Sequence, residues 1–180
     1  MKLLIPNASN RVYNLNSKQL IKLFSRIFGT DLEEMNDHLN KGDVSDTCRY
    51  YFSKSNKIKP ASESKLTLDD VDSYLDKLSQ LTKENDQLKL LEEIVKKCTK
   101  NDLKMFVRII KKDLRIDAGA SVLLDAVNPK AYAAYQVSNN LKDVIERAYQ
   151  ESKTGLKKDL SVKVNLMTVI KVLKNFFDNN

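Results

Sequence analysis

Residues 99–115, TKNDLKMFVRIIKKDLR, place apolar and basic side chains at the spacing of an α-helix. At about 100° per residue, one face holds the apolar side chains Leu103, Phe106, Val107, Ile110 and Leu114. Four cations fall within about 60° of one another on another face: Lys104, Arg108, Lys111 and Arg115. The segment therefore predicts one amphipathic helix with a core face and a basic stripe.

The positive charge of the chain is concentrated around this helix. The 180 residues carry a formal net charge of +7. Residues 96–115 hold eight Lys and Arg against two Asp, a balance of +6. Like charges on one helix face repel each other, and a bound polyanion would remove that cost. The alternative is a solvated face whose Lys and Arg serve helix propensity.

A glycine at position 119 follows the basic helix and precedes another helical segment. Gly119 would let a phosphate approach the backbone, and the amides of Ala120 and Ser121 would lie at the positive end of the new helix. The cations before it are Lys111, Lys112 and Arg115. These residues together predict a phosphate clamp.

A second helix start after a glycine lies in the first half of the chain, at Gly42, Asp43 and Ser45. We predict a counterpart contact there, with ordinary helix capping as the alternative.

Helical periodicity extends over almost the whole chain, and four Gly and three Pro are too few for a turn-rich β fold. Residues that favour a helix start occur repeatedly: Asn16, Thr30, Asp43 or Ser45, Thr67, Thr82, Thr99, Asn128 and Asn140. The fourth predicted helix has an apolar face of Leu68, Val71, Tyr74, Leu75 and Leu78. Residues 53–66 predict a loop, and residues 161–166 alternate like a short strand. The fold class expected is all-α with a short extended C-terminal tail.

Residues that support metal or nucleophile chemistry are few. Cys48 and Cys98 are expected to be buried free thiols, and together with His38 they lack metal-ligand spacing. His38 is expected to be exposed. The longest uncharged stretch has eleven residues, which excludes a transmembrane helix, and no signal peptide is indicated. A reducing intracellular compartment is therefore expected.

An ordered series of short segments carries a family resemblance: residues 12–16 (VYNLN), 18–28 (KQLIKLFSRIF), 42–45 (GDVS), 66–67 (LT), 71–72 (VD), 81–84 (LTKE), 98–99 (CT), 101–104 (NDLK), 113–115 (DLR), Gly119, 124–126 (LDA), 131–132 (AY) and 140–141 (NL). The series closely resembles the N-terminal DNA-binding domain of ATP-dependent DNA ligases, nearest to the DNA ligase III and poxvirus branch. The resemblance covers about residues 5 to 170.

The resemblance implies an all-α bundle of two pseudo-repeated halves, which binds the minor groove and straddles a nick. It implies a DNA-binding domain over residues 1–155, with residues 156–180 as a linker and the start of an adenylation domain. Lys111, Lys112, Arg115 and Gly119 to Ser121 would belong to the second-half contact, and Gly42 to Ser45 to the first-half contact. The implied partner is nicked or gapped double-stranded DNA, in repair, recombination and replication. No membrane partner is implied.

The chain departs from the family at the catalytic motif. A ligase carries AMP on the lysine of Lys-x-Asp-Gly, and the glycines here follow Phe28, Lys41, Ala118 and Thr154. ATP and Mg²⁺ would therefore belong to a catalytic domain absent from this sequence, and the chain alone is expected to be inactive. We expect a fragment, a decayed gene product or a stand-alone module, nuclear if cellular and cytoplasmic if poxvirus-like.

Two alternatives stay open. The chain is one piece of a complete ligase, or it is a helical scaffold whose basic stripe binds an acidic protein partner.

Overall fold

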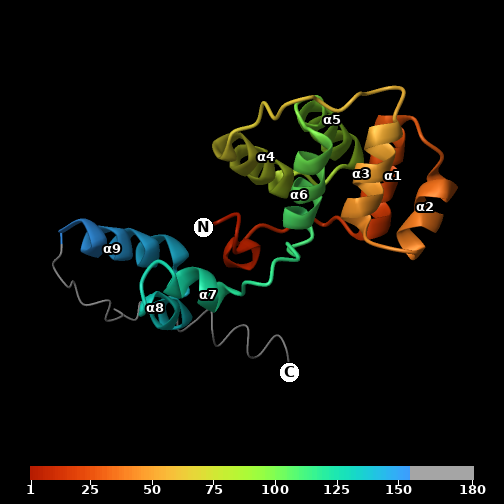
Figure 1. The fold of residues 1–180 in the computed structure, drawn as a ribbon. Helices are drawn as coiled ribbons and strands as arrows, with labels where there is room; N and C mark the ends of the chain where they lie inside the picture. The colour runs from red at the N-terminus through yellow and green to blue at the C-terminus, as the bar shows by residue number, and fades with distance from the viewer. Residues whose placement is uncertain (155–180) are drawn as a thin grey trace. The chain divides into compact units, whose positions relative to one another are not determined.

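The computed structural model describes residues 1–154, and every regular element in that range is a helix (Figure 1). The predicted all-α class is confirmed for these residues. The strand and extended tail predicted beyond residue 155 lie outside the described residues. The contacts divide the chain into two compact units. Within the described residues, we call Asn10–Arg115 the central unit, and Met1–Ser9 with residues 116–154 the split unit.

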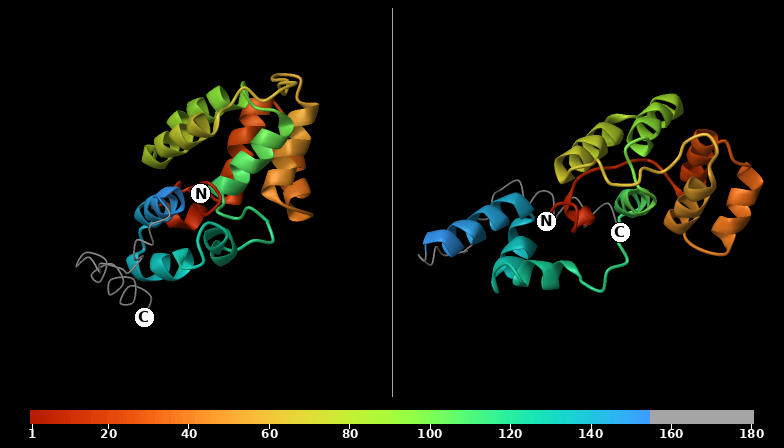
Figure 2. Two further views of the ribbon diagram at one scale, coloured as in Figure 1. Left: turned by 60° about the vertical axis from the view of Figure 1, so that its left-hand side comes forward. Right: turned by 45° about the horizontal axis from the view of Figure 1, so that its top comes forward.

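The central unit contains six helices that follow one another along the chain (Figure 2): α1 (Ser17–Phe28), α2 (Leu32–Asn40), α3 (Val44–Lys54), α4 (Leu68–Gln80), α5 (Glu84–Val95) and α6 (Lys100–Ile110). The segment between α3 and α4 contains no helix, which agrees with the predicted loop. The boundary predicted at residue 155 and the two pseudo-repeated halves stay predictions.

Reciprocal capping boxes begin α1, α4 and α6 where the sequence predicts them. Asn16 exchanges hydrogen bonds with Gln19, and the same arrangement occurs at Thr67 and at Thr99. Each box satisfies two backbone N–H groups that the first helical turn leaves free. Gly29 ends α1 in the left-handed region, with φ 68°.

Three other predicted helix starts are wrong. The N-cap of α2 is Asp31 instead of Thr30, because its carboxylate accepts from the amides of Glu33 and Glu34 at 2.8 and 3.0 Å. Helix α5 begins after Lys83 without a side-chain cap, instead of at Thr82. The predicted start of α8 (Ala131–Ser138) was Asn128, but the helix begins two residues after Pro129, with Lys130 as its N-cap.

The core of the central unit is built around α1 and α3. The rings of Phe24, Phe28 and Phe52 stack in series, with centroids 5.4 and 5.3 Å apart. The most extensive contact between helices is that of α3 with α6, which lie side by side (Figures 1 and 2). The buried guanidinium of Arg11 bonds Asp72 and Asp76 of α4, which ties the segment before α1 to this helix.

Leu68 was expected to face the core, and this prediction is wrong. Its side chain is 77% exposed. The buried residues Tyr74, Leu75 and Leu78 lie in the second half of α4, whereas Leu68 is its first residue. Helical periodicity correctly gives the face on which Leu68 lies, but the neighbours that would cover it do not reach the start of the helix.

The split unit has a small core of its own. It contains the 3₁₀ helix η1 (Pro6–Ala8), α7 (Ala120–Asp125), α8 and α9 (Leu141–Thr154). Ile5, near the start of the chain, packs in one cluster with apolar side chains from residues 124–144. Among the described residues, no helix combines the length and the apolar character needed to cross a bilayer.

We predict that Phe28→Ala lowers the free energy of unfolding by about 3–5 kcal/mol, the usual range for deleting a buried phenyl ring. Phe28 is 1% exposed and stacks between two other rings. Leu68→Ala, the matched control on α4, should change it by less than about 0.5 kcal/mol. Urea denaturation measures both variants, and similar losses would contradict this description of the core.

Candidate functional site

The basic stripe does not continue along α6 as the sequence predicted. The helix ends at Ile110, with Lys111 as its C-cap. The N–H of Lys112 donates to the carbonyl of Ile109 and that of Asp113 to Arg108, which is the hydrogen-bond pattern of a Schellman ending. Lys112 then takes φ 55° and Arg115 φ 51°. Lys111 still has helical backbone geometry, with its N–H donating to the carbonyl of Val107. The predicted position of Arg115 on the stripe is wrong, because the chain leaves the helix before that residue.

The first two cations of the stripe pair with carboxylates of α3. Lys104 Nζ lies 2.5 Å from Asp46 Oδ1. The Nη2 of Arg108 lies 3.8 Å from carboxylate oxygens of both Asp43 and Asp46. Since the N-terminal end of α3 meets the C-terminal end of α6, the two helices are antiparallel. These ion pairs offset the repulsion that the sequence alone suggested.

Asp43 connects the two helices at several atoms. Its side chain is 13% exposed and caps α3 by accepting from the amide and the hydroxyl of Ser45. The Nη1 of Arg115 lies 3.9 Å away. Burial pushes the pKa of Asp43 upward, but the two bonds from Ser45 and the charges of Arg115 and Arg108 hold it below its ordinary value of 3.8. The carboxylate therefore stays ionised within a cationic group.

A pocket of about 300 Å³ opens beside this network, and we call it the α3–α6 pocket. It brings both predicted contact segments of the central unit together. Its lining is Ser17, Leu39, Gly42, Asp43, Val44, Ser45, Arg108, Lys111, Asp113 and Arg115. Sequence reasoning selected most of these residues as two separate contacts, and the structure makes them one concave surface.

The members of the pocket differ in what they can offer a ligand. The Ser45 side chain is buried and its hydrogen bonds are already made, because its hydroxyl group accepts from Arg108 Nε at 3.1 Å and donates its hydrogen to a carboxylate oxygen of Asp43. Arg115 is 53% exposed, and both of its carboxylate partners, Asp43 and Asp113, lie at 3.5 Å or more. Lys111 has no carboxylate partner within residues 1–154. Lys111 and Arg115 are therefore the available cations.

Neither glycine of the predicted contacts is needed for backbone conformation. Gly42 lacks a positive φ, and an added Cβ would meet only the carbonyl oxygen of His38 at 3.9 Å. Gly119 is the N-cap of α7 with φ −73°, and a Cβ there would meet nothing within 4 Å. Gly119, Ala120 and Ser121 belong to the split unit, and their predicted role beside Lys111 and Lys112 stays a prediction.

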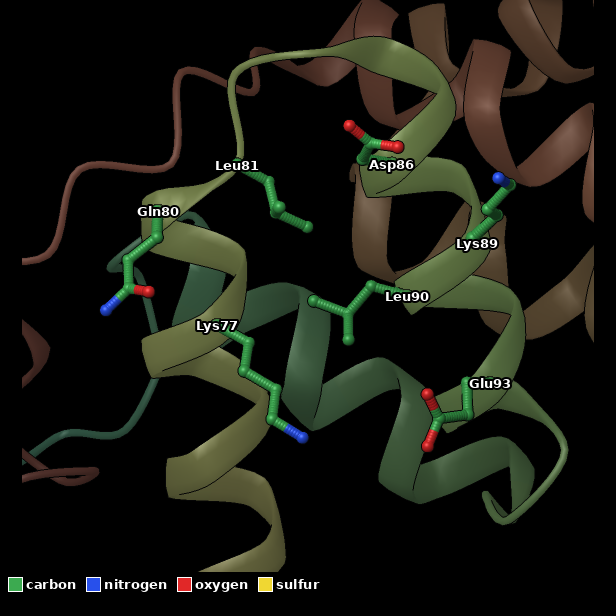
Figure 3. A pocket seen from close by; sticks show the side chains of 7 residues that line it. All are labelled: Lys77, Gln80, Leu81, Asp86, Lys89, Leu90 and Glu93. Carbon is green, nitrogen blue, oxygen red and sulfur yellow. The ribbon is translucent and has the colours of Figure 1, made fainter.

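A second pocket, of about 440 Å³, lies between α4 and α5 (Figure 3). Leu81 and Leu90 project into it, and its rim carries both signs of charge: Lys77, Lys89, Asp86 and Glu93. Because its cations are balanced by carboxylates, this pocket is a weaker candidate for a polyanion.

The residues with metal or thiol chemistry are separate from the α3–α6 pocket. Within residues 1–154, no group of three or more His, Cys, Asp or Glu could hold a metal ion. Cys48 and Cys98 are buried free thiols, as predicted, and burial raises the pKa of Cys98 to about 12. The prediction that His38 is simply exposed is wrong, because its ring stacks on Tyr50 and its Nδ1 lies 2.9 Å from Thr47 Oγ1.

Comparison with known proteins places these observations in a family. Residues 1–128 match the family described as DNA ligase N terminus. The chain is 46% identical over 170 residues to a DNA ligase of vaccinia virus (strain Western Reserve), which covers 94% of this chain and 30% of that protein. It is 41% identical to a fowlpox virus DNA ligase (84% and 27%) and 38% identical to DNA ligase 3 of Dictyostelium discoideum (83% and 12%). The chain thus spans less than a third of the length of these relatives, and the resemblance read from its motifs is confirmed.

We predict that acid weakens the fold partly through Asp43. Because its folded-state pKa is lowered, its stabilising effect is present above pH 3.8 and is lost as the pH falls below that value. Asp43→Asn keeps a good N-cap but cannot titrate, so its unfolding free energy should depend less on pH in that window. Urea titrations from pH 5 to pH 2.5 measure the slope. The control is Asp37→Asn, an exposed residue of α2, and an equal change in both variants would contradict the prediction.

We further predict that Lys112→Gly raises the unfolding free energy by up to about 1 kcal/mol, because a non-glycine residue in the left-handed region is strained. Lys112→Gln removes the charge and keeps the strain, so it should leave stability nearly unchanged. Thermal melts of both variants measure the difference. A gain with glutamine as large as that with glycine would show that charge, not backbone strain, limits stability there.

Proposed function

The chain belongs to the family of DNA ligase N-terminal domains, and from that premise we propose that it binds duplex DNA through the phosphate backbone. The α3–α6 pocket is the observation that carries the proposal. It gathers Lys111, Arg108 and Arg115 around Gly42 in one concave surface. Cations that surround exposed backbone suit a phosphate group, which carries negative charge and accepts hydrogen bonds.

In the proposed complex, Lys111 and Arg115 bind a phosphate directly, and Gly42 gives it room to approach the backbone. Arg108 lines the pocket and is 16% exposed, so it contributes mainly through its charge. Lys104 acts through Asp46, which it neutralises beside the site. Before DNA binds, Asp43 holds Arg108 and Arg115 in place. In the complex, the phosphate lies nearer to Arg115 than the Asp43 carboxylate does.

Lys112 and residues 119–121 complete the proposal. Lys112 has no carboxylate partner in the described part of the chain and keeps a strained left-handed backbone, which is typical of residues retained for a function. We assign it to a neighbouring phosphate. Gly119, Ala120 and Ser121 would supply a further backbone contact. Phosphate contacts carry little sequence information, so no base preference is expected.

At the level of the whole protein, we propose that this domain holds nicked or gapped DNA for a ligase catalytic domain, in repair, recombination and replication. ATP and Mg²⁺ would act in that catalytic domain. The cellular site would be the nucleus, or the cytoplasm for a poxvirus-like protein.

The double variant Lys111→Gln, Arg115→Gln tests the proposed pocket. It should weaken duplex binding for every sequence tested and reduce the slope of log K against log salt by about 1.8, or about 0.9 for each lost phosphate contact. The control is Lys77→Gln, Lys89→Gln, which removes the same charge from the α4–α5 pocket of Figure 3. Fluorescence anisotropy at several salt concentrations measures both slopes.

Equal slopes for the two double variants would overturn the assignment to the α3–α6 pocket. Nicked and intact duplexes of one sequence are compared in the same assay, and tighter binding to the nicked duplex supports a role at strand breaks. Poly-glutamate that binds while duplex DNA does not would favour the acidic protein partner instead.

A further inference from the structure

A third pocket lies farther along the same pair of helices and has a different composition. It has a volume of about 350 Å³ and is lined by His38, Asp46, Arg49, Tyr50, Ser53 and Lys100. We call it the aromatic pocket. It lies toward the C-terminal end of α3 and the N-terminal end of α6, opposite to the end that forms the α3–α6 pocket.

The charge balance of the aromatic pocket favours an anion. Its one carboxylate, Asp46, is already paired with Lys104 at 2.5 Å and with Arg108 at 3.8 Å. Arg49 and Lys100 have no carboxylate partner among residues 1–154. Lys100 is also the first residue of α6, where the helix dipole adds positive potential. The pocket therefore presents two uncompensated cations.

Aromatic stacking gives this pocket a fixed wall. The rings of His38 and Tyr50 stack with centroids 4.8 Å apart, and Lys54 Nζ lies 4.2 Å from the centroid of the Tyr50 ring. The Tyr50 hydroxyl also accepts a hydrogen bond from Lys54. Because His38 and Lys54 already hold the Tyr50 ring, this side chain loses little further rotational freedom when a ligand binds. A small loss of freedom favours affinity.

The two pockets are neighbours on the α3–α6 pair. Asp46 lines the aromatic pocket and pairs with Arg108, which lines the α3–α6 pocket. From Ser45 to Tyr50 the α3 axis rises about 7.5 Å, at about 1.5 Å per residue. Charges along one strand of B-DNA are about 3.4 Å apart along its axis. The two pockets are therefore close enough for one strand to reach both.

We infer that the aromatic pocket is a second backbone-phosphate site, and that one DNA strand runs along the α3–α6 pair and occupies both pockets. Arg49 and Lys100 bind the second phosphate, and Tyr50 forms the wall beside it. This inference rests on the proposed function and adds to it the path of the strand.

The test is the double variant Arg49→Gln, Lys100→Gln in the full chain, with duplex DNA as the probe. Its salt slope should fall by about 1.8, as for Lys111→Gln, Arg115→Gln. The charge-matched control is again Lys77→Gln, Lys89→Gln. Lys100 is exposed and Arg49 is half-buried. Thermal melts of the variants should match that of the unmodified chain, so that a change in slope reports on binding and not on folding.

The outcomes separate the inference from the proposed function. If Lys111→Gln, Arg115→Gln lowers the slope and Arg49→Gln, Lys100→Gln behaves as the control, the second phosphate site is wrong and the α3–α6 pocket stands. If the unmodified chain does not bind duplex DNA, both proposals fail. Equal loss of slope in the two pocket variants, with an unchanged control, supports a strand that crosses both pockets.

Discussion

The antiparallel contact of α3 with α6 is the constraint on which the candidate site depends. Its buried side contains the ring stack that includes Phe52 and the apolar face of α6. Its polar edge contains the pairs of Asp43 and Asp46 with Lys104 and Arg108. Interdigitated apolar side chains restrict how two packed helices can slide, and this set of ion pairs favours the same single register. That register brings the start of α3 next to the end of α6 and so creates the α3–α6 pocket.

The acidic residues in this basic region, Asp43 and Asp46, position the neighbouring cations. Exposed ion pairs contribute little stability, but Asp43 is largely buried and also caps α3, so removing it affects helix start and arginine position together. A carboxylate within a site for an anion lowers the net positive charge of that site. It also holds the guanidinium groups ready, so that less side-chain freedom is lost when an anion binds.

The cations that follow α6 lie on a strained segment of backbone. Lys112 and Arg115 adopt left-handed backbone conformations that glycine would adopt without strain. The turn directs the chain back over the end of the helix, where Leu114 is buried and Arg115 reaches toward Asp43. A straight extension of α6 would have carried Arg115 away from α3. The short turn is therefore what unites the two segments.

The sequence by itself determined the all-α class, the capping boxes at Asn16, Thr67 and Thr99, the buried thiols and the family, because these depend on local hydrogen bonding, periodicity and motif order. It also selected candidate contacts, among them Gly42 to Ser45 and the cations Lys111, Lys112 and Arg115. Only the tertiary structure decided that Lys104 and Arg108 are ion-paired, that α6 ends before Arg115, that Leu68 is exposed and that His38 stacks on Tyr50. The ion pairs and the ring stack depend on partners from other helices, as Arg108 does on Ser45 and the acidic residues beside it. Helical periodicity carries no information about which distant carboxylate or ring will lie opposite a given side chain.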